Sequence, residues 1–215
     1  MKPLCVFYHA ILSGGTIPID TGYAAALMGD QMEALKLSGL MDACDEFYVG
    51  VNGGDEDASI ARMLAPAKAK MLTHGPGTTT EIPTLKCLAG WAASHPDSYV
   101  MYHHIKGVTH PYEAVYAAWR QRMENAVVWG WRNCVADLEA GYDSAGAHWL
   151  TPEQFPTLVQ GTPFWGGTFW WARADYLMTL PPLPAPTWQN RYEAERWIGQ
   201  SPTRAHVHDY CPGWP

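Results

Sequence analysis

A cluster of basic side chains follows a short hydrophobic run in the middle of the chain. Residues 99–102 are Tyr, Val, Met and Tyr, a β-branched and aromatic composition typical of a buried strand. His103, His104 and Lys106 follow, and Gly107 opens a loop. In open α/β sheets, ligands bind beyond the carboxyl ends of the strands. This cluster is our first candidate site; the alternative is a solvated lysine beside histidines that bind local backbone groups.

A second candidate is an aromatic segment that two glycines interrupt. Residues 162–174 read TPFWGGTFWWARA, with Gly166 and Gly167 inside an otherwise apolar run. Paired glycines weaken a strand and mark the close approach of another backbone or of a ligand. Trp170 and Trp171 would then form an aromatic wall beside this opening. The alternative is a β-bulge that packs under a long helix.

Two further groups have the composition of a metal site. Asp55 and Asp57 follow a predicted strand and could hold a divalent cation against a diphosphate. We prefer the alternative that they begin a helix, whose first turn favours acidic residues. Near the end of the chain, His206, His208 and Asp209 lie close together and could bind a metal or a phosphate.

The segment RYEAERWIG predicts a short helix that carries two glutamates on different faces. Helical spacing places Glu193 and Trp197 on one face and Glu195 on another, and Gly199 ends the helix. The two carboxylates therefore have different surroundings.

The elements that must position these groups alternate between strand and helix. Apolar runs predict strands at residues 4–8, 46–51, 69–73 and 99–102, with helical segments between them. A loop containing Gly14 and Gly15 follows the first strand, and residues 112–138 predict a long helix interrupted only at Gly130. Alternation of this kind predicts an α/β fold whose central sheet is mostly parallel and flanked by helices.

Composition describes a globular protein. The 215 residues are 47% hydrophobic and 16% charged, and the net charge of −7 argues against a broad electrostatic grip on nucleic acid or anionic membrane. Five scattered cysteines without a C-x-x-C pair fit reduced thiols. No run approaches the roughly 20 apolar residues of a membrane span. We expect one domain over residues 1–215, no membrane span and a cytoplasmic location; the sequence leaves the oligomeric state open.

The order of these elements, together with the segments YHHIKGVTHP, FWGGTFWWARADYL and YEAERWIG, resembles the nucleotide-sugar-dependent glycosyltransferases of the GT-A type. More narrowly, the chain is similar to small bacterial and phage glycosyltransferase-like proteins with H-x-K-G and G-x-F-W-W segments. The resemblance implies one Rossmann-like domain, with a nucleotide-sugar-binding half at residues 1–111 and an acceptor-side half at residues 112–215. It also implies a hexosyltransferase-like reaction that takes a sugar from a nucleotide sugar, a UDP-sugar first, to a hydroxyl group.

The resemblance also shows a departure from the family pattern. Most GT-A enzymes carry a metal-binding D-x-D motif at the end of the central strand, where this chain has His104, Ile105 and Lys106. We therefore expect Lys106 and His104 to stabilise the departing diphosphate directly. Metal dependence is open, and the alternative metal ligands are Asp55, Asp57 and His208.

Further roles are carried over by resemblance. The sequence leaves open whether the reaction inverts or retains the configuration of the sugar; if it inverts, the first choice for the base that takes the acceptor's proton is Glu195, followed by Glu193 and Asp175. Besides His104 and Lys106, the expected donor contacts are Tyr8, His9, Gly53, Gly54, Gly107, Gly166 and Gly167. The expected acceptor contacts are Trp170, Trp171 and Glu193.

The acceptor has two candidates. A saccharide ranks first, and a hydroxymethylated base in phage DNA ranks second, because a Trp-rich site could hold an unstacked base but the chain is acidic. A patch of Arg120, Arg122 and Arg132 could still meet DNA phosphates. Two other classes of function are a non-catalytic carbohydrate- or nucleotide-binding module and, less favoured, a histidine-based metal hydrolase.

Overall fold

A central β-sheet runs through both halves of the chain. The computed structural model describes residues 2–13, 18–75, 80–157, 159, 161–203 and 205–213, so the predicted loop at Gly14 and Gly15 lies outside the described residues. Within them, seven strands form one sheet, in the spatial order β3 (Lys70–Thr73), β2 (Glu46–Asn52), β1 (Leu4–Ile11), β4 (Tyr99–His104), β8 (Trp170–Arg173), β5 (Ser144–Gly146) and β9 (Val207–Asp209). A two-stranded sheet pairs β6 (Trp149–Leu150) with β7 (Phe164–Trp165).

The sheet is mostly parallel, as the alternating sequence pattern predicts. β1 pairs in parallel with β2 on one side and β4 on the other, while β8 is antiparallel to both of its neighbours. The chain passes from β1 to β2 and β3 in one direction and then returns to place β4 on the opposite side of β1. The carboxyl ends of β1 and β4 therefore form a topological switch point, where α/β proteins bind ligands.

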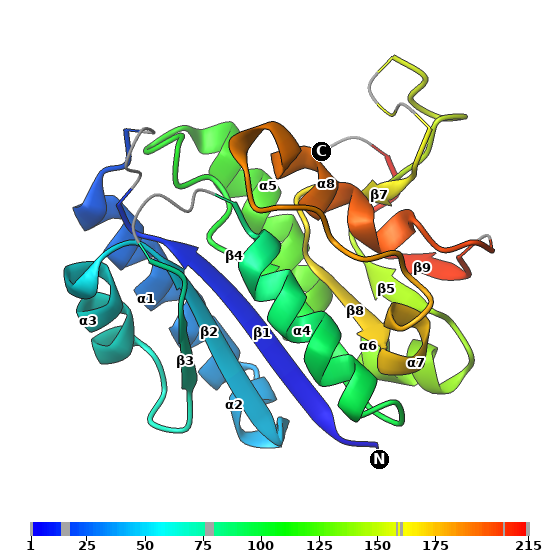
Figure 1. Ribbon diagram of the computed structural model, residues 1–215, viewed down its shortest axis with the longest axis horizontal. Helices are drawn as coiled ribbons and strands as arrows, with labels where there is room; N and C mark the ends of the chain where they lie inside the picture. The colour runs from blue at the N-terminus through cyan, green and yellow to red at the C-terminus, as the bar shows by residue number, and fades with distance from the viewer. Residues whose placement is uncertain are drawn as a thin grey trace.

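Helices cover both faces of the sheet (Figure 1). One face packs against α1 (Thr21–Leu37), α2 (Leu40–Ala43), α3 (Asp55–Leu64), the π-helical segment η1 (Asn125–Trp129) and α6 (Trp131–Glu139). The other face packs against α4 (Ile82–Ser94), α7 (Ala174–Leu177) and α8 (Arg191–Arg196). The α/β prediction with a helix-flanked, mostly parallel sheet is confirmed. None of the helices in the described residues has the length and hydrophobicity that crossing a membrane requires.

The first and fourth strands are longer than their apolar runs predict. β1 continues to Ile11 and β4 continues to His104, and their parallel register places His9 beside His104. Since successive side chains of a strand point to opposite faces, the two histidines of β4 separate. The His103 ring packs at a tilt against the Tyr8 ring in the core of one face, and His104 lies on the face that α4 covers.

The predicted long helix is divided into three segments, α5 (Ala114–Glu124), η1 and α6, with Gly130 before α6. The glycine turn between β7 and β8 packs against the first of these. Gly167 has φ +95°, and a Cβ there would lie 2.5 Å from the Met123 Sδ atom. The turn thus lies against α5, and β8 continues under η1, where Trp171 Nε1 donates to the Val127 carbonyl oxygen at 2.9 Å.

Candidate functional site

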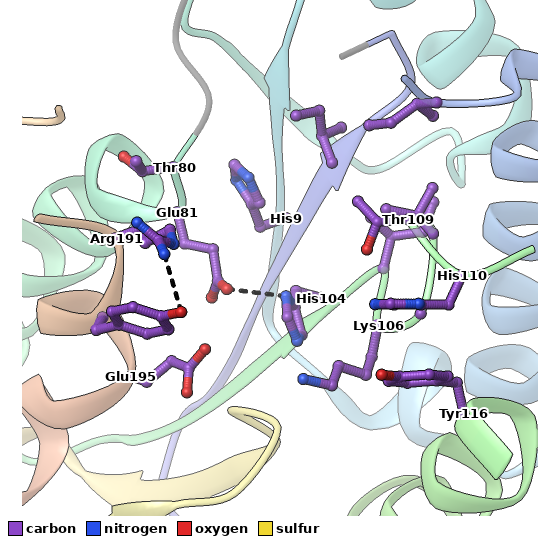
Figure 2. A pocket seen from close by; sticks show the side chains of 16 residues that line it. His9, Thr80, Glu81, His104, Lys106, Thr109, His110, Tyr116, Arg191 and Glu195 are labelled. Atoms are coloured by element: carbon purple, nitrogen blue, oxygen red, sulfur yellow. Dashed lines mark hydrogen bonds and ion pairs between the residues drawn. The ribbon is translucent and has the colours of Figure 1, made fainter. Parts of the chain in front are cut away.

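A pocket of about 240 Å³ opens at the carboxyl ends of β1 and β4 (Figure 2). Its walls come from the end of β1, the residues before α4, the loop after β4, one residue of α5 and one face of α8. The side chains that carry its chemistry are His9, Glu81, His104, Lys106, Arg191 and Glu195.

His104 is held between two hydrogen-bond acceptors. Its Nδ1 atom lies 3.0 Å from Glu81 Oε1, and its Nε2 atom lies 2.8 Å from the carbonyl oxygen of Gly167. A carbonyl oxygen and a carboxylate can only accept, so we assign a proton to both ring nitrogens. His104 is therefore a fixed imidazolium cation at the switch point.

Glu81 is the carboxylate that this assignment requires. Burial on its own raises the pKa of Glu81, but the charge and hydrogen bond of His104, together with His9 and Tyr102, outweigh it and hold that pKa at about 2. The second carboxylate oxygen accepts a hydrogen bond from the Tyr102 hydroxyl at 2.8 Å. Tyr102 and His104 lie two residues apart on β4, so one face of that strand supplies both contacts.

Lys106 brings a second positive charge into the pocket. Its Nζ atom lies 4.2 Å from the centroid of the Trp119 ring, a cation–π contact. Figure 2 shows its ammonium directed toward the wall that carries Glu195. The Lys106 carbonyl oxygen accepts a hydrogen bond from Arg120 Nη1 at 3.1 Å, and Gly107 follows with φ +86°. The turn is thus tied to α5.

A polar network supports this loop from behind. Gln31 donates to the His104 carbonyl oxygen at 3.3 Å and to Glu124 Oε1 at 2.9 Å, and its own oxygen accepts from the Tyr8 hydroxyl at 2.7 Å. Arg120 Nε lies 3.8 Å from the same Glu124 oxygen. Side chains from β1, α1 and α5 therefore position the backbone on which His104 and Lys106 stand.

Glu195 faces these cations from α8. Burial raises the pKa of Glu195, against the opposing charge of Lys106, while Glu81 raises it further and His104 lowers it. Among the described residues, no hydrogen bond or ion pair joins its carboxylate. A partly buried carboxylate with a raised pKa, directed into a pocket, has the properties of a general base.

The floor of the pocket is neutral. Burial lowers the pKa of His9 to about 3 and also lowers that of His74. His9 Nδ1 and His74 Nε2 both lie 2.8 Å from the Thr84 hydroxyl oxygen. The charge in the pocket therefore comes from the side chains of its walls, and the His9 ring contributes none.

The residues named from the sequence separate into those that line the pocket and those that do not. His9, His104, Lys106, Gly107 and Glu195 line it. Gly167 holds His104 directly, and Tyr8 binds Gln31, which in turn binds the His104 carbonyl oxygen. Away from the pocket, Glu193 accepts from Arg196 at 3.5 Å and from Gln200 at 3.1 Å. The residues buried in the core are Gly166, Trp170 and Trp171.

Asp175 lies at the other end of the sheet. It forms an ion pair with Arg173 at 2.9 Å, and Arg173 pairs with Tyr99 at the amino end of β4. Because β8 runs antiparallel to β4, the end of β8 points away from the pocket. The structure does not bring Asp175 to Lys106 or Glu195.

The candidate metal ligands are separated and have other partners. The Asp57 carboxylate accepts hydrogen bonds from the Gly54 amide at 2.8 Å and from the Ser13 hydroxyl at 2.6 Å. The bond from the Gly54 amide caps α3. Asp55 is exposed. The close contact with Asp57 leaves no room for a Cβ at Gly53. His208 on β9 lies 2.9 Å from Asp137. In the part of the chain that the structure describes, no group of three or more His, Cys, Asp or Glu residues could hold a metal ion.

Sequence reasoning missed two charged residues of the pocket. Glu81 directly precedes Ile82 and Pro83 at the start of α4, in the connection that follows β3. An acidic residue at the carboxyl edge of a parallel sheet was a signal that could have found it. Arg191 lies four residues before Glu195, and that helical spacing indicates a shared face.

No protein-family model and no curated protein sequence matches the chain. Among solved structures, a mycobacterial protein is similar at 14% identity and a TM-score of 0.46. The similarity covers 86% of this chain and 57% of that protein. Rv0371c from Mycobacterium tuberculosis H37Rv is similar over 99% of this chain and 90% of its own, at 13% identity and a TM-score of 0.48. The M. tuberculosis glucosyl-3-phosphoglycerate synthase is similar over 100% of this chain and 74% of its own, at 13% identity and a TM-score of 0.43.

These likenesses are distant, with every one of the three TM-scores below 0.5. The fold and the pocket define an α/β protein with a charged pocket at the switch point of its sheet.

Proposed function

We propose that the protein is a glycosyltransferase that moves a sugar from a nucleotide sugar to a hydroxyl group of an acceptor. The observation that carries the proposal is the arrangement of charges across one pocket. Two cations, His104 and Lys106, lie on one wall, and the Glu195 carboxylate lies on the other. Such a pair of walls can stabilise a departing diphosphate and accept a proton from the attacking hydroxyl.

The cations serve the leaving group. When the bond between the anomeric carbon and the diphosphate breaks, negative charge develops on the diphosphate oxygens. Groups that are already oriented toward that charge stabilise it without reorganising. Glu81 and Gly167 hold His104 in place, and the Trp119 ring supports the Lys106 ammonium. By resemblance, Lys106 supplies charge that a D-x-D-bound metal supplies in most GT-A enzymes.

Glu195 serves the acceptor. As the acceptor oxygen forms its bond to the anomeric carbon, its proton passes to the Glu195 carboxylate, and the nucleoside diphosphate leaves from the opposite side. The configuration of the sugar is thereby inverted. The raised pKa of Glu195 makes it a stronger base than an exposed glutamate.

The size of the pocket suits the reacting end of the donor. A volume of about 240 Å³ accommodates a sugar and part of a diphosphate, and it is smaller than the roughly 300–1,000 Å³ of pockets that enclose a whole ligand. The nucleoside would extend along the same sheet edge toward Gly53 and Gly54, which follow β2. A UDP-sugar is the first donor to test.

A saccharide is the preferred acceptor. Two of the three arginines considered for DNA contact have partners in the fold: Arg120 binds the Lys106 carbonyl oxygen, and Arg132 lies 4.3 Å from the Trp131 ring centroid. Hydroxymethylated DNA is the second acceptor to test.

The first experiment is donor binding. A thermal-shift panel of UDP-, GDP-, ADP- and dTDP-sugars, each with manganese or with EDTA, should show one nucleotide sugar that raises the melting temperature, because a ligand that binds the folded state stabilises it. Lys106→Met should weaken that binding roughly 10- to 100-fold, the effect of losing a contact with a charged group. A shift that persists in EDTA supports the Lys106 role. No shift with any donor would contradict the proposal.

A matched pair of glutamate variants then tests catalysis. Glu195→Gln should retain donor binding and lose transfer activity by about 10²- to 10⁴-fold. Glu193→Gln, on the same helix but bound to Arg196 and Gln200, should stay near wild type. Full activity of Glu195→Gln would exclude it as the base. Donor binding by the wild type without transfer to any acceptor would instead support the alternative, a non-catalytic nucleotide- or carbohydrate-binding module.

A further inference from the structure

The wall that carries Glu195 also carries a positive charge. Arg191 and Glu195 both line the pocket, and both belong to α8. Residues four apart in a helix share a face and are separated by about 6 Å along its axis. One molecule in the pocket can therefore contact both side chains. Arg196 is directed elsewhere on the same helix, toward Glu193 at 3.5 Å.

The Arg191 side chain is held in position by its neighbour. Its Cζ atom lies 4.1 Å from the centroid of the Tyr192 ring, and its Nη2 atom donates a hydrogen bond to the Tyr192 hydroxyl at 2.9 Å. Figure 2 shows the Arg191 side chain on the side of the pocket opposite Lys106. Arg191 is thus oriented before a ligand binds, which reduces the entropy that an anion must overcome to bind it.

A positive charge on the α8 wall of the pocket can bind an anionic group of a ligand. The chain as a whole carries a net charge of −7, which disfavours anionic ligands. Inside the pocket, the Glu81 charge is balanced by His104. With Lys106 assigned to the donor diphosphate, Arg191 is the cation on the wall that carries Glu195. We propose that the acceptor is a small hydroxyl compound with a carboxylate or phosphate group, and that Arg191 binds this anionic group.

This inference rests on the proposed function and adds the class of acceptor. The placement of Arg191 and Glu195 on one wall of the pocket favours a compact molecule that carries both a hydroxyl and an anionic group. A sugar phosphate and a uronic acid share this chemistry and differ in the source of the charge.

Binding of matched compounds tests the inference without requiring turnover. The wild-type protein, saturated with the nucleoside diphosphate of the donor found above, is titrated calorimetrically with glucose, glucose 6-phosphate and glucuronate. We expect one or both anionic compounds to bind about 10- to 100-fold more tightly than glucose. Arg191→Met should remove this preference while retaining affinity for the nucleoside diphosphate, which shows that it is folded. Arg196→Met, the matched control, should keep the preference.

The outcomes separate this inference from the proposed function. Donor binding together with equal affinities for all three compounds, or a preference that survives in Arg191→Met, overturns the anionic acceptor and leaves the glycosyltransferase proposal in place. Tighter binding of a hydroxymethylated oligonucleotide than of either anionic sugar also overturns it. The absence of any nucleotide-sugar binding overturns the proposed function and this inference with it.

Discussion

At the scale of single residues, the site depends on the protonation of His104. A neutral imidazole has one N–H donor, but both ring nitrogens of His104 face oxygen acceptors, at Glu81 and at Gly167. The Glu81 carboxylate lies beside the ring and balances the positive charge. Glu81 thus acts on the ligand through His104, as a positioning residue.

Replacing Glu81 should therefore change the charge of His104. In Glu81→Gln we expect ¹⁵N NMR at about pH 7.5 to show one protonated ring nitrogen on His104 instead of two, since a neutral amide does not stabilise the imidazolium. Transfer activity should fall by about tenfold or more, the effect of losing one charged contact. Glu113→Gln, which alters the exposed pair of Glu113 and His110, is the control and should leave the His104 signals unchanged. Two protonated nitrogens in Glu81→Gln would contradict the assignment.

At the scale of elements, the turn between β7 and β8 connects packing to the site. Its residue Gly167 holds His104 through a carbonyl oxygen, and the same glycine packs tightly against Met123 of α5. A positive φ and a close neighbour together exclude a side chain at this position. The turn therefore sets the position of the His104 ring.

Gly167→Ala should lower the free energy of unfolding by roughly 1–3 kcal/mol, because the added Cβ meets a sulfur atom and the backbone is strained. Gly90→Ala is the matched control: Gly90 lies within α4 with no heavy atom near its added Cβ. The free energy of unfolding of Gly90→Ala should rise by roughly 0.5–1 kcal/mol, because alanine has a higher helix propensity than glycine. Urea unfolding measures both changes, and equal stabilities for the two variants would contradict this account of the turn.

At the scale of the whole molecule, buried histidines tie stability to pH. Burial lowers the pKa values of His9, His74 and His103 in the folded state, to about 3 for His9. In the unfolded chain these groups titrate near 6.5. The unfolded state therefore binds more protons below that pH. The stability that depends on the neutral histidines is fully present above about pH 6.5 and is lost as the pH falls toward the folded-state values.

We expect the free energy of unfolding, measured in urea between about pH 8 and pH 4.5, to decline below about pH 6.5. His103→Phe tests the cause, because a phenyl ring can keep the tilted contact with Tyr8 and the stacking on Phe169, whose ring centroids lie 5.2 and 4.3 Å from that of His103. The Nδ1 atom of His103 has no hydrogen-bond partner among the described residues, so its loss leaves no other group unpaired. The free energy of unfolding of His103→Phe should decline less steeply with falling pH than that of the wild type. An identical slope would exclude His103 as a contributor.

The sequence by itself determined the local features of this protein. Hydrophobic runs and helical spacing predicted where the first four strands lie along the chain and that helices connect them. They also placed the His103, His104 and Lys106 cluster at the carboxyl end of the central strand, and they separated Glu195 from Glu193. These are properties of neighbouring residues, because side-chain periodicity follows from backbone geometry alone. The single-domain and cytoplasmic predictions stay predictions.

Only the tertiary structure decided which distant groups meet. Glu81 and Gly167 are separated from His104 by 23 and 63 residues, and their contacts depend on how β4 pairs with its neighbours. The same pairing buries Trp170 and Trp171 beneath helices, and it carries Asp175 to the opposite edge of the sheet. The spatial order of the strands and the antiparallel direction of β8 arise from the packing of the whole sheet, so no local pattern in the sequence contains them.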